Sequence, residues 1–482
     1  MALELAEAHL RGLLAQLGLD AEYVRGEGDT LWWRTASGDE VPVVDFVGGY
    51  GSLVLGHNHP EIVAHARELL AGGVPVHAQF SYHPYANDLA AALNRVLWRE
   101  FGTFEPYSAV FANTGAEAVE VALKHAEMAR GARVAALRAE IEEHLADAPA
   151  DLAARVREHN ESRYDTPPVF LTLEGSFHGK LAGSVQLTHN PGYRVPFRAL
   201  AVPARFVSGG EVAKAVEESR VTVLDVHDGQ VVERDLPVVA AFFVEPIQGE
   251  GGIHVLDPVV AADIRAVADA HGFPVVVDEI QTGVGRTGKF YAASHVGLLG
   301  DYIVLAKALG GGIAKTSVLL VRQSAYVPEF ELLHSSTFAK DAFSCHIGSR
   351  VVDFLESSDA YARAAARGTA LKQALRSVAA EFPTVVADVR GRGLMLGLEF
   401  HDQTGAPDPV GELARTGLVG YVVAGYLLNH HRVRVFPTAS ASHTLRFEPS
   451  IGITDAQIDQ LVIGLRAVCT ALRDNPLTLL PG

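Results

Sequence analysis

Four apolar runs, interrupted only by Thr172 and each about the length of one strand, constrain the fold of this chain more than any other feature. They lie at residues 169–173, 238–244, 274–277 and 302–305, within a region where short apolar runs alternate with helical patterns. A strand that is apolar on both faces must be covered on both faces, as in a mainly parallel sheet with crossover helices. The sequence therefore predicts an α/β protein.

Shorter elements flank this region. Leucines at helical spacing predict a helix over about residues 2–17, and strand-like segments follow at 30–34 and 40–46. Beyond Cys345, helices over about 346–382 precede strand-like segments at 394–400, 433–436 and 444–447. The latter group indicates a smaller α+β unit.

The segment from about 132 to 163 stands apart from this pattern. It is rich in Ala, Arg and Glu, carries leucines at helical spacing, and is interrupted near 148–150. We interpret it as a helical hairpin inserted into the α/β unit. The pattern fits a solvent-exposed insertion without a specific role. It also fits an insertion that contacts a partner or affects the access of substrate.

Composition excludes several classes of protein. The net charge of −17 argues against a general binder of nucleic acid or anionic membranes. No uncharged apolar run is long enough for a transmembrane helix, and the N-terminal stretch carries acids where a signal or transit peptide carries bases, so we expect a cytoplasmic protein. Two cysteines and no convincing histidine spacing predict no metal site.

Lys307 follows the run 302–305 after one residue and lies between Ala306 and Ala308. An ammonium group in apolar surroundings loses solvation, so its pKa falls and the neutral amine becomes available for a Schiff base. Taken alone, the position also fits a surface lysine whose charge reaches water. The neighbouring motifs favour the first interpretation.

Asp278 follows the run 274–277, at the edge where open α/β sheets bind ligands. A carboxylate there needs a cation or hydrogen-bond donors. A pyridinium nitrogen is one such cation, and its protonation makes the ring an electron sink. A metal ion, or a helix that the aspartate caps, would also satisfy this carboxylate.

A turn of small residues joins a predicted strand at 108–112 to a predicted helix at 116–130. The first amides of the helix, from Gly115 and Ala116, favour an anion before them, and Thr114 can add a hydroxyl. A plain helix cap by Asn113 or Thr114 would explain the same residues.

Two further patterns carry less information. Phe177 and His178 stand just beyond the run 169–173; the phenylalanine could stack on a flat cofactor, although such a residue usually belongs to the core. Residues 283–288 match the G-x-G-x-x-G fingerprint, but 278–282 separate them from the preceding strand and no acid follows at the required spacing. We therefore expect no nicotinamide or flavin site.

Together these motifs resemble the class III aminotransferases, pyridoxal-phosphate (PLP) enzymes of fold type I. The matches run in order over nearly the whole chain, at 55–60, 114–118, 177–179, 244–252, 278–288, 306–312 and 391–397. The resemblance implies a large PLP-binding domain at 76–345, with the helical insert at about 132–163. It also implies a smaller α+β domain built from both chain ends, 1–75 and 346–482.

The resemblance implies roles around the ring of PLP. Lys307 would hold the cofactor as an internal aldimine and then move the Cα proton of the substrate. Asp278 would pair with the pyridine nitrogen, and Gln281 would touch the ring hydroxyl. Phe177 would stack on the ring, and the same cofactor-binding set includes Glu245, close behind Asp278, and His178.

It also implies a phosphate site shared between subunits. Gly115 and Ala116, next to Thr114, would bind the phosphate of PLP. Thr337 would reach the same phosphate from the other subunit of a homodimer.

Two further residues concern the substrate. Arg446 stands where the family places its carboxylate-binding arginine, and Glu250 where several members keep a glutamate that pairs with it. A guanidinium that is neutralised in one half-reaction and freed in the other lets one pocket accept two differently charged substrates. The implied reaction moves an amino group from an amino acid or ω-amine to a 2-oxo acid such as 2-oxoglutarate.

Some features depart from the family pattern. Phe177 follows Gly115 by 62 positions because of the insert, Lys315 is an unexpected cation in 313–317, and Ser450 stands where a second proline is common. PLP enzymes of this fold that decarboxylate, shift an amino group, racemise, or form carbon–carbon bonds by β- or γ-replacement therefore remain an alternative. A non-enzymatic relative would be expected to lose Lys307 or Asp278, and both are present.

Overall fold

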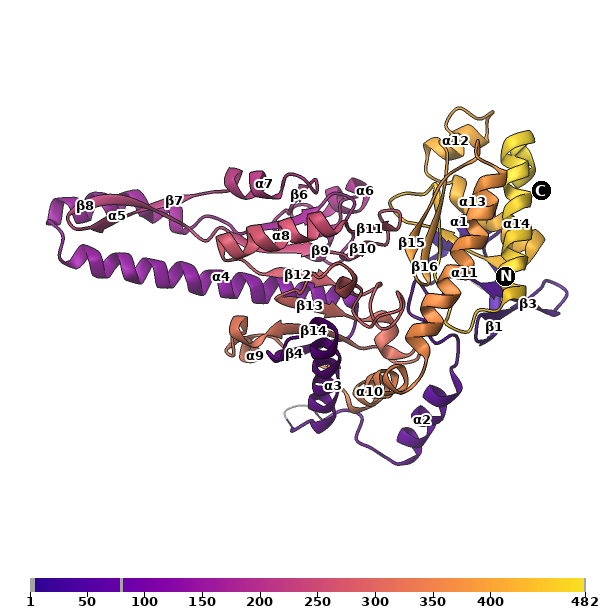
Figure 1. Cartoon of the computed structure of the whole chain (residues 1–482), viewed down its shortest axis with the longest axis horizontal. Coiled ribbons are helices and arrows are strands. Elements are labelled where there is room, and N and C mark those ends of the chain that lie inside the picture. The colour runs from indigo at the N-terminus through magenta and orange to yellow at the C-terminus, as the bar shows by residue number, and fades with distance from the viewer. Residues whose placement is uncertain (1–4, 79–80, 481–482) are drawn as a thin grey trace.

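The computed structural model of the chain describes residues 5–78 and 81–480, and its centre is a seven-stranded sheet (Figure 1). The strand order is β4-β14-β13-β12-β9-β5-β6. β14 runs antiparallel to both neighbours and the other pairs are parallel, which confirms the predicted α/β class. The strands are β4 Tyr107–Ala112, β5 Val169–Leu173, β6 Arg205–Val207, β9 Val239–Val244, β12 Val275–Asp278, β13 Tyr302–Leu305 and β14 Ser317–Arg322.

Helices cover this sheet on both faces, as the apolar runs require. Successive side chains of a strand point to opposite faces. Accordingly, Val275 and Val277 of β12 pack in a cluster with α8 (Pro258–His271), whereas Val276 packs in a cluster with α4 (Gly115–Ala146). The helices α7 (Val212–Glu218), α3 (Pro84–Phe101) and α10 (Ala342–Ser357) extend the packing.

The register of the central strands brings the predicted cofactor residues to one edge. Asp278, at the end of β12, pairs with Val304 of β13, and Lys307 follows β13 after one residue. Because β12 and β13 are parallel, their carboxyl ends meet at the same edge of the sheet.

Both chain ends contribute to a second set of sheets. One sheet has the order β15-β16-β19-β18, and the other has the order β1-β2-β3-β17, in which the late strand β17 pairs in parallel with β3. Figure 1 shows both termini at this end of the molecule. The strands are β1 Glu22–Glu27, β2 Thr30–Arg34, β3 Glu40–Asp45, β15 Val386–Arg392, β16 Met395–Phe400, β17 Val433–Arg434, β18 Phe436–Pro437 and β19 Thr444–Phe447.

Several helices complete this part of the chain. They are α1 Ala8–Gln16, α11 Ala360–Glu381, α12 Val410–Arg415, α13 Val419–His431 and α14 Asp455–Asp474, whereas α2 (Pro60–Ala71) packs against α10. Residues 2–4 of the predicted first helix lie outside the described residues. No helix among the described residues is both long and apolar enough to cross a membrane. The predicted domain boundaries at 75/76 and 345/346 stay predictions.

A long arm projects from the large sheet, at the left of Figure 1. It consists of the outer part of α4, the helix α5 (Ala150–Tyr164) and the hairpin of β7 (Thr222–His227) with β8 (Gln230–Asp235). Buried apolar residues from both helices and from the 222–238 region hold it together.

The arm differs from the expected helical hairpin in two ways. The predicted break near 148–150 falls where α4 ends, but no boundary separates the insert from the helix predicted at 116–130; α4 runs unbroken for 32 residues. Gly131 lies within α4, because a single glycine costs a helix only about 1 kcal/mol and packing further out offsets it. The β7–β8 hairpin, which the sequence analysis did not identify, forms the other side of the arm.

Candidate active site

A cavity of about 270 Å³ lies at the carboxyl ends of β5, β12 and β13. Most of the residues predicted to bind a cofactor line it. The lining residues are Gly115, Ala116, Phe177, His178, Gly179, Lys180, Glu245, Ile247, Asp278, Ile280, Gln281, Thr282 and Lys307.

Lys307 enters this cavity from a strained backbone position. It begins a short 3₁₀ turn after β13 with a φ of 45°, in the left-handed region that non-glycine residues rarely adopt. Burial lowers the pKa of its amine, and the carboxylates of Glu448 and Glu250 only partly oppose this shift. The amine is therefore closer to its neutral, nucleophilic form than that of an ordinary lysine.

Asp278 and His178 form a buried pair in the floor of the cavity. His178 Nδ1 lies 2.7 Å from Asp278 Oδ2, and the other ring nitrogen lies 3.2 Å from the Thr172 hydroxyl. Burial opposes a charge on the imidazole, but the hydrogen bond and charge of Asp278 outweigh it and raise the pKa of His178. The backbone N–H of Ile280 donates to Asp278 Oδ1 at 3.0 Å, so the carboxylate is held in one orientation.

Glu245 is a second buried carboxyl beside this pair. It accepts hydrogen bonds from the backbone N–H groups of Phe177 at 2.9 Å and Gly249 at 3.2 Å. Burial raises the pKa of Glu245 to about 7, although the charge of His178 lowers it. Its oxygens thus hold the two loops that close the cavity.

The turn before α4 combines an anion site with a helix cap. Gly115 and Ala116 line the cavity at the N-terminus of α4, where the helix dipole favours an anion. The Thr114 side chain caps the helix by accepting from the backbone N–H of Glu117 at 3.3 Å, which is the plain explanation left open above. The turn fits tightly, since a Cβ on Gly179 would lie 2.8 Å from the Ala116 Cβ.

Phe177 lies against the cavity and is half-buried. Its ring meets that of Tyr193 edge-on at 6.5 Å, and the Lys180 ammonium lies 3.8 Å from the centre of the Tyr193 ring. Neither Tyr193 nor Lys180 was singled out from the sequence.

Arg446 and Glu250 form a buried ion pair with two hydrogen bonds. Arg446 Nη1 donates to Glu250 Oε1 at 2.5 Å and Nη2 donates to Oε2 at 2.7 Å. The guanidinium is 1% exposed, and its central carbon lies 4.7 Å from the centre of the Tyr50 ring. Although burial opposes ionisation, Arg446 lowers the pKa of Glu250, so both groups are charged. The structure thus brings together the two residues expected to bind substrate.

Glu448 was overlooked as a site residue and joins the cofactor residues to the arginine. Its Oε2 accepts from Gln281 Nε2 at 3.1 Å and lies 4.0 Å from Arg446 Nη1. Gln281 Nε2 also lies 3.4 Å from the carbonyl oxygen of Tyr50. Two charged residues inside the apolar pattern 444–448 were the available signal, because a strand rarely buries charges without a partner.

Five of the residues singled out from the sequence do not line this cavity: Thr114, Glu250, Lys315, Thr337 and Arg446. Thr337 is exposed and follows Ser336, whose hydroxyl accepts from Asn113 Nδ2 at 2.9 Å, next to the turn before α4. Lys315 is exposed and does not line the cavity.

Comparison with known proteins shows the family of this chain. Residues 19–468 match the sequence profile of the family described as Aminotransferase class-III. The chain belongs to this family. It is therefore a PLP-dependent aminotransferase, as the order of motifs predicted.

The relatives of this aminotransferase cover most of its length. A putrescine aminotransferase from Pectobacterium atrosepticum is 30% identical over 444 residues, covering 90% of this chain and 81% of the relative. The crystal structure of an ornithine aminotransferase from Toxoplasma gondii ME49 has a TM-score of 0.70 at 24% identity, covering 94% and 91% of the two chains. An ornithine aminotransferase from Plasmodium falciparum has a TM-score of 0.66 at 21% identity, covering 95% and 94%. The solved structures share the fold type I architecture.

The residues of the aminotransferase cavity fit PLP. An amine with a lowered pKa, a buried carboxylate and a helix N-terminus without bulky side chains face one space. These groups match the aldehyde, the ring nitrogen and the phosphate of the cofactor.

Proposed function

We propose that this aminotransferase takes its amino group from an amino acid or an ω-amine and passes it to a 2-oxo acid such as 2-oxoglutarate. The observation that carries the proposal is the buried pair of Arg446 with Glu250. While Glu250 neutralises the guanidinium, Arg446 presents no net positive charge that would repel an amine. Once Glu250 turns away, Arg446 can bind a carboxylate with two hydrogen bonds.

Within the cavity, Lys307 would bind PLP and then move the Cα proton of the substrate. Bound PLP supplies an electron sink that allows this proton to leave. Asp278, oriented by His178, would keep the ring nitrogen protonated, and Phe177 would lie against the ring. The lowered pKa of Lys307 leaves its amine ready to accept a proton.

The remaining contacts would orient the cofactor. Gly115 and Ala116 would bind its phosphate through the N-terminus of α4, with Thr114 beside them. Gln281, held by Glu448, would contact the ring hydroxyl. Glu245 would stay behind Asp278 and keep the two loops of the cavity together.

We further propose a homodimer in which Thr337 completes the phosphate site of the partner subunit. Leu332, Leu333 and Phe338 are exposed around this loop, and an apolar groove of about 440 Å³ borders the short helix α9 (Phe330–Leu333). Exposed apolar patches of this kind mark protein–protein interfaces. A cytoplasmic location is also a proposal, which the two free, buried cysteines support because thiols persist in reducing compartments.

A variant pair tests the substrate proposal. Arg446→Lys replaces the guanidinium, with its paired N–H donors, by an ammonium. The KM for 2-oxoglutarate should rise by about 10- to 100-fold because charge-assisted hydrogen bonds are lost. The rate of the half-reaction with an ω-amine should change less. Glu250→Gln should slow the ω-amine half-reaction instead, because Arg446 then loses the countercharge that is hydrogen-bonded to it and keeps only Glu448, 4.0 Å away.

The measurement follows the visible absorbance of the bound cofactor while putrescine, other amines and amino acids are added without an acceptor. A donor should remove the absorbance and 2-oxoglutarate should restore it. Arg466→Lys serves as a control, because Arg466 makes a similar two-hydrogen-bond pair with Glu381 between exposed parts of α14 and α11. Equal effects of Arg446→Lys on both half-reactions would contradict the proposed switch.

A further inference from the structure

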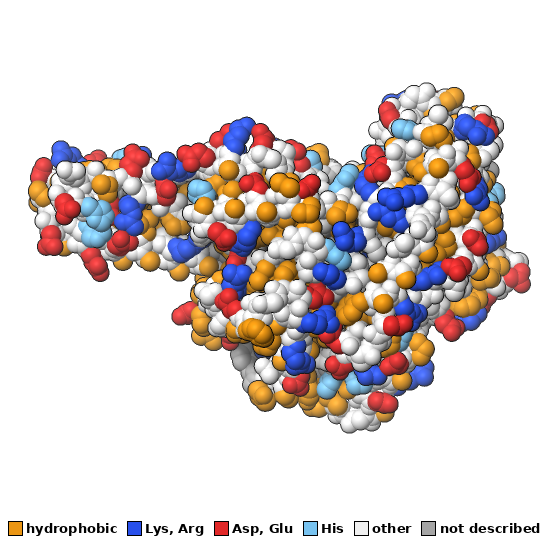
Figure 2. Space-filling model, viewed as in Figure 1, with side chains coloured by type: hydrophobic (Ala, Val, Ile, Leu, Met, Phe, Trp, Pro, Cys, Tyr) orange, Lys and Arg blue, Asp and Glu red, His pale blue; other side chains and the backbone are white. Residues whose placement is uncertain are grey.

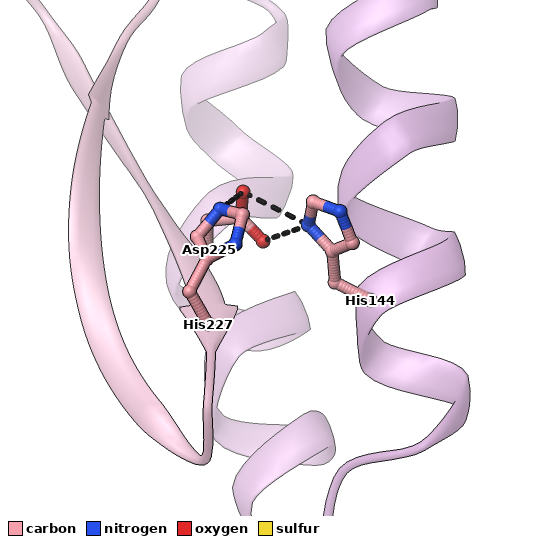
Figure 3. Close-up of side chains that lie close together, drawn as sticks. All are labelled: His144, Asp225 and His227. Atoms are coloured by element: carbon pink, nitrogen blue, oxygen red, sulfur yellow. Dashed lines mark hydrogen bonds and ion pairs between the residues drawn. The ribbon is translucent and has the colours of Figure 1, made fainter.

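Two histidines and an aspartate from distant parts of the sequence meet in the arm (Figure 3). His144 lies in the last turn of α4, and Asp225 and His227 lie on β7. His144 Nδ1 is 2.9 Å from Asp225 Oδ1 and 3.2 Å from Oδ2, and His227 Nε2 is 3.0 Å from Oδ2. No other group of three His, Cys, Asp or Glu side chains in the described part of the chain comes together in this way.

We propose that this cluster binds one divalent transition-metal ion of the zinc type, through His144 Nδ1, His227 Nε2 and the Asp225 carboxylate. Two imidazoles and a carboxylate form a ligand set that Zn²⁺ accepts. Metal–ligand bonds of about 2.0–2.1 Å at tetrahedral angles place ligand atoms about 3.3 Å apart. The ligand atoms here lie within 4.8 Å of one another, so small side-chain rotations are enough.

The cluster has a rigid base and an open side. Asp225 is fully buried, and its Oδ1 accepts from the backbone N–H of Val226 at 2.7 Å. Asn160 of α5 bonds both the N–H and the carbonyl of the preceding Leu224, which fixes the strand. The His144 and His227 side chains are 30% and 45% exposed, so an ion can enter from solvent and a water can take a fourth position.

The charges around the cluster also allow a cation. Arg234 Nη1 donates to Asp225 Oδ2 at 2.9 Å and competes for that oxygen. The same guanidinium bonds both oxygens of Glu140, at 3.1 and 3.3 Å, so Arg234 keeps a partner when an ion takes Asp225. Each histidine would present a lone pair to the ion and carry its proton on the other ring nitrogen.

The ion would fasten the end of α4 to β7, near the free end of the arm. Figure 2 shows acidic, basic and histidine side chains together over that end. None of the three ligands lines the cavity of Lys307. The role assigned to the ion is therefore structural, and its test is independent of transamination.

The test uses the full-length, PLP-loaded enzyme without an affinity tag, freed of metal with a chelator. The bound zinc is counted by mass spectrometry after equilibration with Zn²⁺ alone, and the affinity is measured by competition with a chromogenic chelator. We expect one tight site per chain. His144→Gln with His227→Gln should weaken it by more than about 10-fold, and Asp225→Asn should do the same. His159→Gln, elsewhere on the arm, should leave it unchanged.

X-ray absorption at the zinc edge provides a second readout that needs no variant. Nitrogen and oxygen ligands at about 2.0–2.2 Å, including two imidazoles, are expected. Absence of a tight site in the wild-type enzyme would overturn the proposal. So would equal zinc binding by the wild-type enzyme and the double histidine variant, or a site whose ligands include sulfur.

Discussion

At the scale of single residues, Glu448 connects the two halves of the active site. Its carboxylate accepts from Gln281 beside the cofactor residues and faces Arg446 in the substrate pair. Its charge also acts on Lys307 and opposes the lowering of that pKa by burial. Glu448 is therefore placed to influence both proton transfer and substrate binding.

Removing this charge should change how the rate depends on pH. In Glu448→Gln, burial is less opposed and the pKa of the free Lys307 amine falls further, so the acidic limb of the kcat profile, which reports the substrate-bound enzyme, should move to lower pH. The maximum should fall by about 10-fold because Gln281 loses a charged partner. Glu412→Gln, on an exposed helix of the same region, is the control. An unshifted acidic limb would show that Glu448 does not act on the proton transfer.

In the cofactor-free enzyme, Glu245 should make the free energy of unfolding decrease as the pH rises. Its native pKa of about 7 lies above the ordinary value of 4.5, so the folded state binds more protons than the unfolded state between these values. Stability from this group is therefore lost as pH rises through that window.

The melting temperature of the cofactor-free wild-type enzyme, relative to Glu245→Gln, should decrease from about pH 5 to about pH 8. Glu174→Gln, which changes an exposed carboxyl group, is the control. The melting temperature of the wild-type enzyme relative to this variant should show no such decrease with pH. A difference between wild type and Glu245→Gln that stays constant over this range would rule out the raised pKa.

At the scale of elements, the arm depends on one small apolar cluster. Ile141 and Leu145 of α4 pack with Val156 of α5 and with Val223 and Val226 of β7. This cluster is separate from the cores that surround the sheet. The arm should therefore open locally without unfolding the rest of the enzyme.

Ile141→Ala should destabilise the arm by about 2–5 kcal/mol, because Ile141 is 1% exposed and its removal leaves a cavity. Amide hydrogen exchange should accelerate in 137–164 and 222–238, while kcat for transamination stays unchanged. Glu143→Ala, on the exposed side of α4, should leave exchange as it is. Equally faster exchange in β12 and β13 would mean that the arm and the large sheet unfold together.

At the scale of the whole molecule, Arg286 ties distant segments together. It is fully buried and donates to the carbonyl oxygens of Gly51 at 3.1 Å, Leu394 at 2.9 Å and Pro449 at 3.1 Å. Arg286 belongs to the glycine pattern 283–288. That pattern therefore makes turns around a structural arginine, and Gly285 and Gly288 adopt the positive φ values of 90° and 89° that these turns need.

The proposed shared phosphate site predicts complementation between subunits. Lys307→Ala should abolish activity and Thr337→Ala should lower it in dimers of a single variant. A hybrid of the two variants, however, should contain one site with both wild-type residues and recover about half of the wild-type activity. Co-expression with two different tags isolates the hybrid, and light scattering reports its mass. If the hybrid is no more active than a Thr337→Ala subunit alone, then Lys307 and Thr337 of one chain contribute to the same active site.

The sequence by itself determined the elements and the chemistry. The apolar runs at 169–173, 274–277 and 302–305 are strands covered on both faces, and Asp278 and Lys307 follow two of them at one sheet edge. Such features are local, because the order of polar and apolar residues within a segment predicts which of its faces are buried.

Only the tertiary structure decided which distant side chains meet. The contact of Gln281 with Glu448, the three carbonyls around Arg286, and the approach of His144 to Asp225 across 81 positions depend on how completed elements pack. The β7–β8 hairpin is a different case, because its two-residue turn Asp228-Gly229, with φ values of 51° and 72°, is a local hairpin signal that was overlooked. Local periodicity carries no information about the distant pairs, because packing geometry sets them.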